Sequence, residues 1–196
     1  MNPVGGMAEF IMALNEEEAA IPPAGVSGEQ GASCGGAIIA RDAVVDYVKE
    51  GDRVMVLGGS GGVGSAAIQI AKKHAKASFV STTSTQSEFC ILELGADRVI
   101  VYRSEDWWTV KEYRKDKFDV IIDTVGGGNY YGRAEKVLKT GKEGGTFVTV
   151  TGDDPQPDCR TYAKLLKFFS NMLGRIVYTK LKTDATERYV ALMPYE

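Results

Sequence analysis

Five glycines fall within the seven residues Gly58–Gly64, and this cluster constrains the fold more than any other part of the chain. The apolar run before it, Val54–Leu57, has the length and composition of a buried strand, and a helix-periodic segment follows directly. Gly59, Gly61 and Gly64 match the spacing G-x-G-x-x-G in the strand-to-helix context that this pattern requires. The sequence therefore predicts a strand, a glycine turn and a helix that together bind a dinucleotide.

Each glycine of this pattern has a physical reason. The first permits a tight turn, the second lets the backbone approach a diphosphate, and the third allows the helix to pack closely on the strand. The free amides at the start of the helix, with its positive dipole end, then hold the phosphates. The predicted diphosphate-binding residues are Gly59, Ser60, Gly61, Gly62, Val63 and Gly64. A Walker A loop is excluded because no Gly-Lys-Ser/Thr closes the run.

Composition and charge narrow the class of protein. The chain has 196 residues, 44% of them hydrophobic, which is ample for one core and marginal for two. A net charge of −3 argues against nucleic acid as a partner, and no apolar run approaches the roughly 20 residues of a membrane span. Three scattered cysteines without a C-x-x-C motif, and no secretory signal at the start, predict an intracellular protein with reduced thiols. With His74 as its single histidine, the chain is not expected to build a zinc site of its own.

Strand and helix patterns alternate after the glycine turn, which predicts an α/β fold. We expect a Rossmann-type, doubly wound, mostly parallel six-stranded sheet in the order 3-2-1-4-5-6. The expected strands after the first are 77–82, 98–102, 118–123, 145–151 and 175–181, and the expected helices between them are 86–94, 107–114, 131–139 and 161–173. Residues 185–192 begin another helical pattern. The first fifty residues do not follow this alternation: Ser27 and Gln30 have the spacing of a capping box, and residues 42–49 form a second helical candidate.

Five segments resemble the cofactor-binding domain of the medium-chain dehydrogenase/reductase superfamily. They are GGMAEF (5–10), EGDRVMVLGGSGGVGSAAIQIAKK (50–73), LGADRVIVY (94–102), FDVIIDTVGG (118–127) and EGGTFVTVTG (143–152). The resemblance is to the zinc-independent, quinone-oxidoreductase-like branch, which includes the reticulon-4-interacting-protein and alkenal/enone reductase types. One departure is that the first helix lacks the terminal glycine usual in the family, with Ala75 or Lys76 in its place.

The resemblance implies a two-domain enzyme in which a GroES-like catalytic domain surrounds the Rossmann domain. Residues 1–26 are then a short irregular remnant of the catalytic domain, and residues 27–196 are the dinucleotide-binding domain, cut short at its C-terminal end. The full enzyme is expected to transfer a hydride from NAD(P)H to a quinone or an α,β-unsaturated carbonyl, without zinc. No catalytic residue is assigned, and the fragment alone is expected to be inactive. The cytoplasm is the expected compartment, with mitochondrion and plastid also compatible.

The choice of dinucleotide depends on the end of the second strand. NAD-binding domains place an acid about 20 residues after the glycines, whereas this chain has the hydroxyl-rich run 81–85, which includes Thr83 and Ser84. A carboxylate there would repel a 2′-phosphate and hydroxyls can bind it, so we expect NADPH in preference to NADH. The resemblance implies that Ser84 and Tyr102 lie beside the adenosine phosphate, and that Thr124 and Val125 border the nicotinamide ribose. The lysine often found in the next helix of the family is absent.

Alternatives come from other classes of protein. Gly58, Gly62 and Gly64 fit the glycine turn of short-chain dehydrogenases, and 113–117 and 178–182 both read Y-x-x-x-K. A Rossmann module that binds nucleotide without catalysis is the other alternative.

Two further features of the sequence concern a side chain and a surface. Asp123 could serve as a catalytic acid, but we interpret it as a structural carboxylate at a strand end. Apolar residues in 165–173 suggest a homodimer contact.

Overall fold

The computed structural model describes residues 21–84, 88–127, 130–140, 144–152 and 188–191, with isolated positions between 162 and 174. The chain divides into two compact units, residues 1–34 and residues 35–196. In the first unit, the predicted capping box is confirmed: the Ser27 hydroxyl accepts from the Gln30 amide, and the Gln30 side chain accepts from the Ser27 amide, at the start of α1 (Gly28–Ala32). The predicted domain boundary between residues 26 and 27 stays a prediction.

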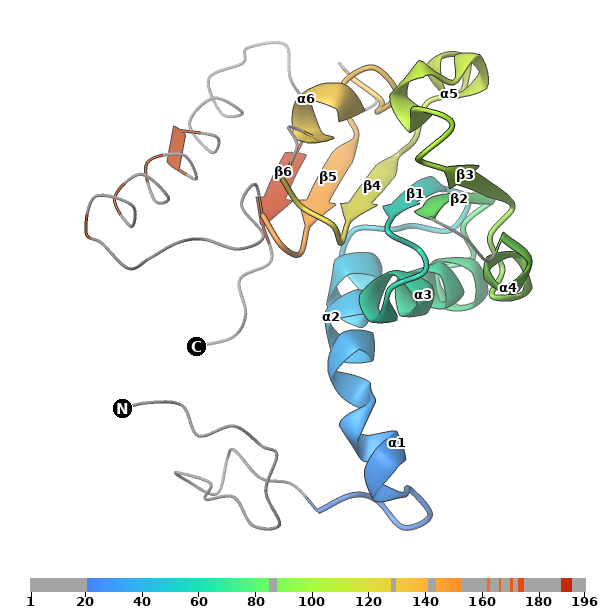
Figure 1. The fold of residues 1–196 in the computed structure, drawn as a ribbon, viewed down its shortest axis with the longest axis vertical. Helices are drawn as coiled ribbons and strands as arrows, with labels where there is room; N and C mark the ends of the chain where they lie inside the picture. Colours follow the sequence, from blue (N-terminus) through green and yellow to red (C-terminus); the bar gives the residue numbers. More distant parts are fainter. Residues whose placement is uncertain are drawn as a thin grey trace. The chain divides into compact units, whose positions relative to one another are not determined.

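The second unit is built on one parallel sheet (Figure 1). Its first five strands are β1 (Arg53–Leu57), β2 (Phe79–Ser84), β3 (Arg98–Val101), β4 (Val120–Asp123) and β5 (Thr146–Thr149). The helical elements are α2 (Cys34–Val45), α3 (Gly62–Gln69), the π-helix η2 (Ile70–His74), α4 (Glu88–Glu93), the 3-10 helix η3 (Trp107–Thr109), α5 (Lys111–Lys115) and α6 (Tyr130–Ala134). The parallel five-stranded order 3-2-1-4-5 of the predicted Rossmann-type sheet is confirmed.

A further strand, β6 (Arg188–Ala191), pairs in parallel with β5 and completes the order β3-β2-β1-β4-β5-β6. The helix predicted over residues 185–192 is therefore wrong at these four positions. The segment 175–181, where the sixth strand was predicted, lies outside the described residues. Residues 188–191 form a strand and not a helix because β5 offers an open edge for hydrogen bonding. An edge of this kind can favour a strand against the local helical pattern.

Strand side chains alternate between two separate cores, one on each face of the sheet. Val54 and Val56 of β1 pack in the core formed with α2, α3 and α4, whereas Met55 and Leu57 pack in the core formed with η3, α5 and α6. Figure 1 shows the two groups of helices on opposite faces. Such burial on both faces is typical of parallel strands and explains the continuous apolar composition of β1.

The helix before β1 begins earlier than predicted. The sequence suggested residues 42–49, but α2 spans Cys34–Val45 and buries Ala40, Ala43 and Val44. Its two glycines, Gly35 and Gly36, do not end it. A Cβ at Gly36 would make an ordinary contact with the Gly62 backbone (3.5 Å) and one at Gly35 would meet nothing within 4 Å, so the low helix propensity of glycine is overcome by the burial of the other residues of α2.

The helix after the glycine turn ends in a conformation that favours glycine. Lys76 has φ of +55°, the one positive φ of a non-glycine residue among those described. The Ala77 amide donates to the Ala71 carbonyl (2.9 Å), six residues back, so the hydrogen bond that closes the π-helix η2 across the left-handed Lys76 spans one residue more than the 6→1 bond of a Schellman motif. The family glycine that is missing from this sequence would thus occupy position 76.

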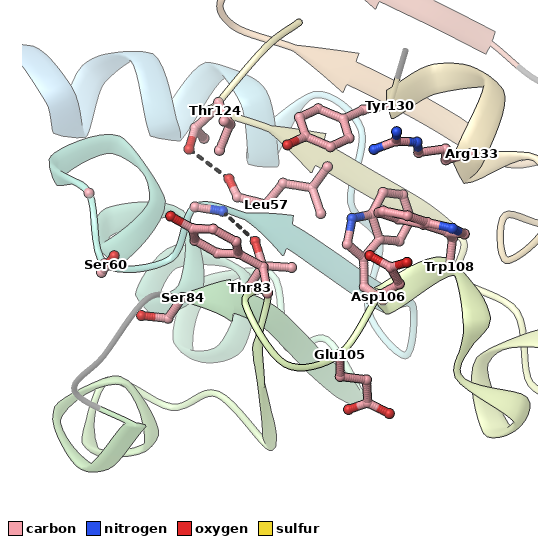
Figure 2. Close-up of a pocket in the computed structure, with 15 residues that line it drawn as sticks. Leu57, Ser60, Thr83, Ser84, Glu105, Asp106, Trp108, Thr124, Tyr130 and Arg133 are labelled. Atoms are coloured by element: carbon pink, nitrogen blue, oxygen red, sulfur yellow. Dashed lines mark hydrogen bonds between the residues drawn. The ribbon is translucent and has the colours of Figure 1, made fainter. Parts of the chain in front are cut away.

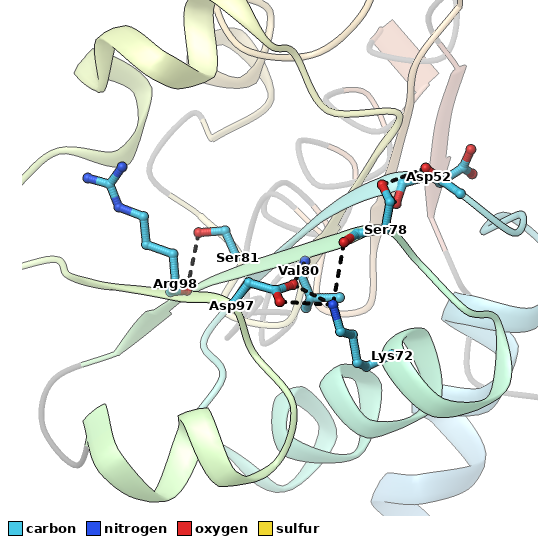
Figure 3. A network of polar contacts seen from close by, with 8 residues as sticks. Asp52, Lys72, Ser78, Val80, Ser81, Asp97 and Arg98 are labelled. Carbon is cyan, nitrogen blue, oxygen red and sulfur yellow. Dashed lines mark hydrogen bonds and ion pairs between the residues drawn. The ribbon is translucent and has the colours of Figure 1, made fainter.

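A polar network ties the end of this helix to the sheet (Figure 3). Lys72 Nζ lies 2.7 Å from one carboxylate oxygen of Asp97 and 2.9 Å from the other. The same carboxylate accepts from the Val80 amide at 2.7 Å. Asp97 belongs to the LGAD segment, so this motif joins the end of the helix after the glycine turn, η2, to β2 and to the beginning of β3.

Candidate functional site

A pocket of about 610 Å³ opens at the carboxyl ends of β1, β2, β3 and β4 (Figure 2). The connections from β1 and β2 run over one face of the sheet and those from β3 and β4 run over the other, so β1 and β4 flank the topological switch point. Ligands of open α/β sheets bind outside the strand ends at such a point. The pocket is lined by Leu57, Gly58, Ser60, Gly61, Thr83, Ser84, Tyr102, Glu105, Asp106, Trp107, Trp108, Thr124, Val125, Tyr130 and Arg133.

The glycine turn is fixed by hydrogen bonds to β2. The Gly58 amide donates to the Thr83 hydroxyl (2.9 Å), and the Gly59 amide donates to the Thr83 carbonyl (2.9 Å). The left-handed residue is Gly58, with φ of +86°, one position before the glycine to which the sequence pattern assigned the tight turn. Gly59 is needed for space instead, because a Cβ there would collide with the Thr82 side chain.

The start of α3 packs closely against the backbone at the end of β1. A Cβ on Gly64 would press on the Gly58 carbonyl, 2.8 Å from its carbon atom, so the tight helix–strand packing predicted for the third glycine is confirmed. Gly61 is the N-cap residue and contributes no side-chain cap. The amides of the first helical turn, Gly62–Gly64, therefore have neither an intrahelical acceptor nor a cap from this residue.

The helix-periodic segment predicted after the glycine turn forms α3 and η2 and turns one side to the core. Ala67, Ile68 and Ala71 are fully buried there, and Val63, Ala66 and Ile70 pack against the same core. Gly64, Ala67, Ile68 and Ala71 have the one-face spacing of a helix that packs on a sheet.

Three hydroxyls of the 81–85 run form hydrogen bonds within the fold. Ser81 shares a hydrogen bond with the Tyr113 hydroxyl (2.6 Å), the Thr82 hydroxyl donates to the Val56 carbonyl (2.7 Å), and the Thr83 hydroxyl accepts from the turn. The structure instead brings Ser84 next to Tyr102, whose amide donates to the Ser84 carbonyl at 3.2 Å. Ser84 is buried and Tyr102 is exposed, and both line the pocket.

The end of β4 forms the opposite wall. The Thr124 hydroxyl donates to the Leu57 carbonyl at 2.7 Å, which places Thr124 and Val125 beside the end of β1. One carboxylate oxygen of Asp123 accepts from the amides of Val125 and Gly126, both at 3.0 Å. Asp123 is buried and does not line the pocket, as expected for a structural carboxylate.

The structure thus brings together seven of the eleven predicted site residues, namely Ser60, Gly61, Thr83, Ser84, Tyr102, Thr124 and Val125. Gly59, Gly62, Val63 and Gly64 do not line the pocket and belong to the frame of the turn. Their assignment to a cofactor stays a prediction.

The sequence analysis missed an aromatic group on one side of the pocket. We call Trp107, Trp108, Tyr130 and Arg133 the aromatic arm. The Arg133 guanidinium carbon lies 4.2 Å from the centroid of the Trp108 ring and 5.7 Å from that of Tyr130. The paired tryptophans shortly after a predicted strand end were a usable signal, because loops at the carboxyl ends of parallel strands carry binding residues.

The first Y-x-x-x-K pair does not form a site in the pocket. Tyr113 is 1% exposed in the core below β1 and β3, and neither Tyr113 nor Lys117 lines the pocket. Burial raises the pKa of Tyr113, and its hydroxyl is used by Ser81. A catalytic tyrosine needs a lowered pKa and access to substrate, so this pair is structural. The second pair, 178–182, lies outside the described residues.

The described part of the chain has neither a metal-ligand cluster nor a membrane-spanning helix. No group of three or more His, Cys, Asp or Glu side chains there is placed to hold a metal ion. No helix there is long and apolar enough to cross a membrane.

In the predicted dimer segment, 165–173, the described residues Leu166 and Leu173 are exposed. The homodimer itself stays a prediction.

Fold and glycine turn define an NAD(P)-binding domain of the Rossmann type. Residues 62–193 match the zinc-binding dehydrogenase family, and the chain belongs to it, as the cofactor-binding domain of a medium-chain dehydrogenase/reductase. The resemblance found in the sequence motifs is thereby confirmed.

Two plant proteins that are similar to this chain are a reductase and an oxidoreductase. The chain is 38% identical over 159 residues to 2-methylene-furan-3-one reductase of Solanum lycopersicum, and 36% identical over 159 residues to the chloroplastic NADPH-dependent alkenal/one oxidoreductase of Arabidopsis thaliana. Each match covers 80% of this chain and 38% of the relative, so the chain spans well under half the length of these proteins. The solved quinone oxidoreductase of Coxiella burnetii is 26% identical, with a TM-score of 0.58 over 85% of this chain and 44% of that one.

Proposed function

We propose that this chain binds NADPH and forms the coenzyme domain of a zinc-independent reductase that transfers a hydride to a quinone or an α,β-unsaturated carbonyl. The observation that carries the proposal is the glycine turn at the switch point between β1 and β4. Its closely packed helix start presents backbone amides at a strand end, beside a pocket large enough for an extended ligand.

The residues of the turn fit a diphosphate. Any side chain at Gly64 would displace the helix from the Gly58 carbonyl, and Gly61 leaves the N-cap position without a side chain of its own. Ser60, Gly62 and Val63 would hold the diphosphate through their amides, since anions bind well at a helix N-terminus. The Gly61 amide already donates to the Gly58 carbonyl (3.0 Å), so Gly61 would border the diphosphate without a side chain in its way. Backbone donors fixed by the sheet lose little entropy when a ligand binds.

The two ends of the cofactor would lie on opposite sides of this turn. Ser84 and Tyr102, joined through their backbones, would contact the adenosine phosphate. Thr124 and Val125, at the end of β4, would border the nicotinamide ribose. When bound, the nicotinamide supplies the hydride, and these residues determine its position.

Names of relatives support the substrate class. One plant relative is a furanone reductase and the other is an NADPH-dependent alkenal/one oxidoreductase. The fold is shared with a quinone oxidoreductase. An electron-poor double bond or a quinone accepts a hydride directly from a reduced nicotinamide, and the domain's task is then to hold the two reactants in line.

Calorimetry on the chain with NADPH and NADH tests the binding half of the proposal. We expect NADPH to bind more tightly than NADH. Gly64→Ala should weaken both, whereas the control Gly28→Ala, at a glycine with open space around its Cβ position, should weaken neither. Absence of heat with both dinucleotides would refute the proposal, and equal or tighter binding of NADH would refute the preference for NADPH.

Turnover is tested separately, on the protein as expressed from its full reading frame. NADPH oxidation with a panel of quinones and enones should be seen. A protein that binds NADPH but reduces no member of the panel would instead be a non-catalytic nucleotide-binding module.

A further inference from the structure

Two buried side chains fix the turns that follow β4 and β5. Asp123, the last residue of β4, accepts through one carboxylate oxygen from the amides of Val125 and Gly126, both at 3.0 Å. Thr149, the last residue of β5, accepts through its hydroxyl from the Gly152 amide at 2.9 Å and donates to the other oxygen of Asp123 at 3.4 Å. Asp123 is 3% and Thr149 is 1% exposed, so both are shielded from solvent. Their hydrogen bonds determine the course of the backbone beside them.

These two turns also contact each other directly. We call residues 124–127 and 150–152 the paired turns. The Gly127 amide donates to the Gly152 carbonyl at 3.2 Å. A Cβ at Gly126 would lie 2.7 Å from the same carbonyl oxygen. Packing this close leaves little room for one turn to move without the other.

One residue of the paired turns presents an apolar surface to the pocket. Val125 is 43% exposed and lines the pocket, while its amide is held by Asp123. Its side chain packs on the glycine turn, because a Cβ at Gly58 would be 2.8 Å from Val125 Cγ2. The adjacent Thr124 hydroxyl is bonded to the Leu57 carbonyl (Figure 2). The position of Val125 is therefore set by Asp123 and by the end of β1 together.

The strand order indicates which half of the cofactor meets the paired turns. In the order β3-β2-β1-β4-β5-β6, β2 and β3 lie on one side of the glycine turn, and β4 and β5 lie on the other. Under the proposed function the ends of β2 and β3 receive the adenosine half, so the nicotinamide half extends toward β4 and β5. Val125 would then contact the nicotinamide half.

We propose that Asp123 is a positioning residue for the nicotinamide half of the cofactor. It holds the amides of Val125 and Gly126, and so determines where the surface beneath the nicotinamide lies, without contacting the cofactor itself. This inference rests on the proposed function. Hydride transfer requires reacting atoms about 3–3.5 Å apart, and a displacement of about 1 Å can cost roughly 100-fold in rate. A wall held by buried hydrogen bonds meets this requirement because it is fixed before the cofactor binds.

A truncated cofactor tests this role, because it separates the two halves. The probes are NADPH and 2′,5′-ADP, which lacks the nicotinamide half, titrated into the full chain by calorimetry. Asp123→Ala leaves two amides of the paired turns without their acceptor, and should weaken NADPH by roughly 5- to 20-fold while changing 2′,5′-ADP by less than about twofold. The fluorescence of the bound reduced nicotinamide should change as well. Asp123→Asn should recover most of the NADPH affinity, since its side-chain oxygen can accept from both amides.

Two further variants separate positioning from a general loss of stability. Tyr113→Phe breaks a buried hydrogen bond below the sheet, away from the pocket lining, and should change neither affinity. Thr149→Val removes the bond to the Gly152 amide and keeps the shape of the side chain. It should weaken NADPH less than Asp123→Ala does and leave 2′,5′-ADP unchanged. Thermal unfolding verifies that each variant is folded, and Thr149→Val provides the same comparison if Asp123→Ala is unfolded.

The outcomes are distinguishable. Equal loss of NADPH and 2′,5′-ADP affinity in Asp123→Ala would overturn the inference and leave the proposed function standing, because Asp123 would then support the domain as a whole. Unchanged NADPH affinity would overturn it in the same way, as would a loss in Asp123→Asn as large as that in Asp123→Ala. Failure of the wild-type chain to bind NADPH or NADH would refute the proposed function and this inference with it.

Discussion

Replacing Gly64 with alanine is the sharpest test of how the glycine turn works. Gly64 lies in the first turn of α3, and its added methyl group would press on the Gly58 carbonyl, 2.8 Å from the carbon atom and 3.0 Å from the Gly59 Cα. Both neighbours are backbone atoms at the end of β1, so no side chain can rotate to make room. The helix start must move away from the strand.

The cost can be worked from two opposing effects. Overpacking of a tight contact costs about 1–3 kcal/mol, and alanine returns up to about 1 kcal/mol of helix propensity over glycine. Because the neighbours of Gly64 are backbone atoms, the overpacking cost lies at the upper end, about 2–3 kcal/mol, and the net loss of unfolding free energy is about 1–2 kcal/mol. For a chain of this size, this corresponds to a Tm lower by roughly 2–8 °C.

Gly62→Ala is the matched control for stability. Gly62 lies in the same helical turn but has nothing within 4 Å of its Cβ position, so the alanine should be neutral or stabilise the fold by up to about 1 kcal/mol. Thermal unfolding followed by circular dichroism measures both variants. A Gly64→Ala protein that melts with or above the wild type would show that close helix–strand packing is not what requires glycine here.

Three further predictions concern stability. Lys76→Gly should stabilise the fold by about 0.5–1 kcal/mol, because relief of the left-handed conformation exceeds the added chain entropy; a loss in urea unfolding would contradict this. Tyr113→Phe should cost about 1 kcal/mol at neutral pH by breaking the bond to Ser81. Burial raises the pKa of Tyr113, so the contribution of its neutral hydroxyl to stability is present below pH 10 and lost at higher pH. The Tyr113→Phe variant should therefore lose less stability than the wild type as pH rises, and parallel pH profiles of the two proteins would refute this. Burial also raises the pKa of Asp52 above 3.8, so the stability that its protonated form contributes is present in acid and lost as pH rises. Asp52→Asn should therefore be more stable than the wild type at pH 7 and no more stable in strong acid. Equal stability of the two proteins at pH 7 would contradict this prediction.

Local patterns determined much of the fold. The glycine turn, the apolar run of β1 and the alternation that follows were sufficient to predict the parallel order 3-2-1-4-5. The capping box at Ser27 was predicted for the same reason, since it involves neighbouring residues only. In each case the residues concerned lie within a short segment, so their spacing in the sequence is enough to predict which of them share a face or form a hydrogen bond.

The environment of each side chain was decided by tertiary structure. The sequence presents the run 81–85 as a row of hydroxyls, yet Ser81 and Thr82 bond to Tyr113 and Val56, which are more than 20 residues away. The aromatic arm likewise joins η3 to α6, and β6 forms where β5 offers an edge. These contacts connect segments far apart in the chain, and no local period carries information about them. The sequence by itself therefore determined the frame and the glycine turn, while folding determined which side chains face the pocket.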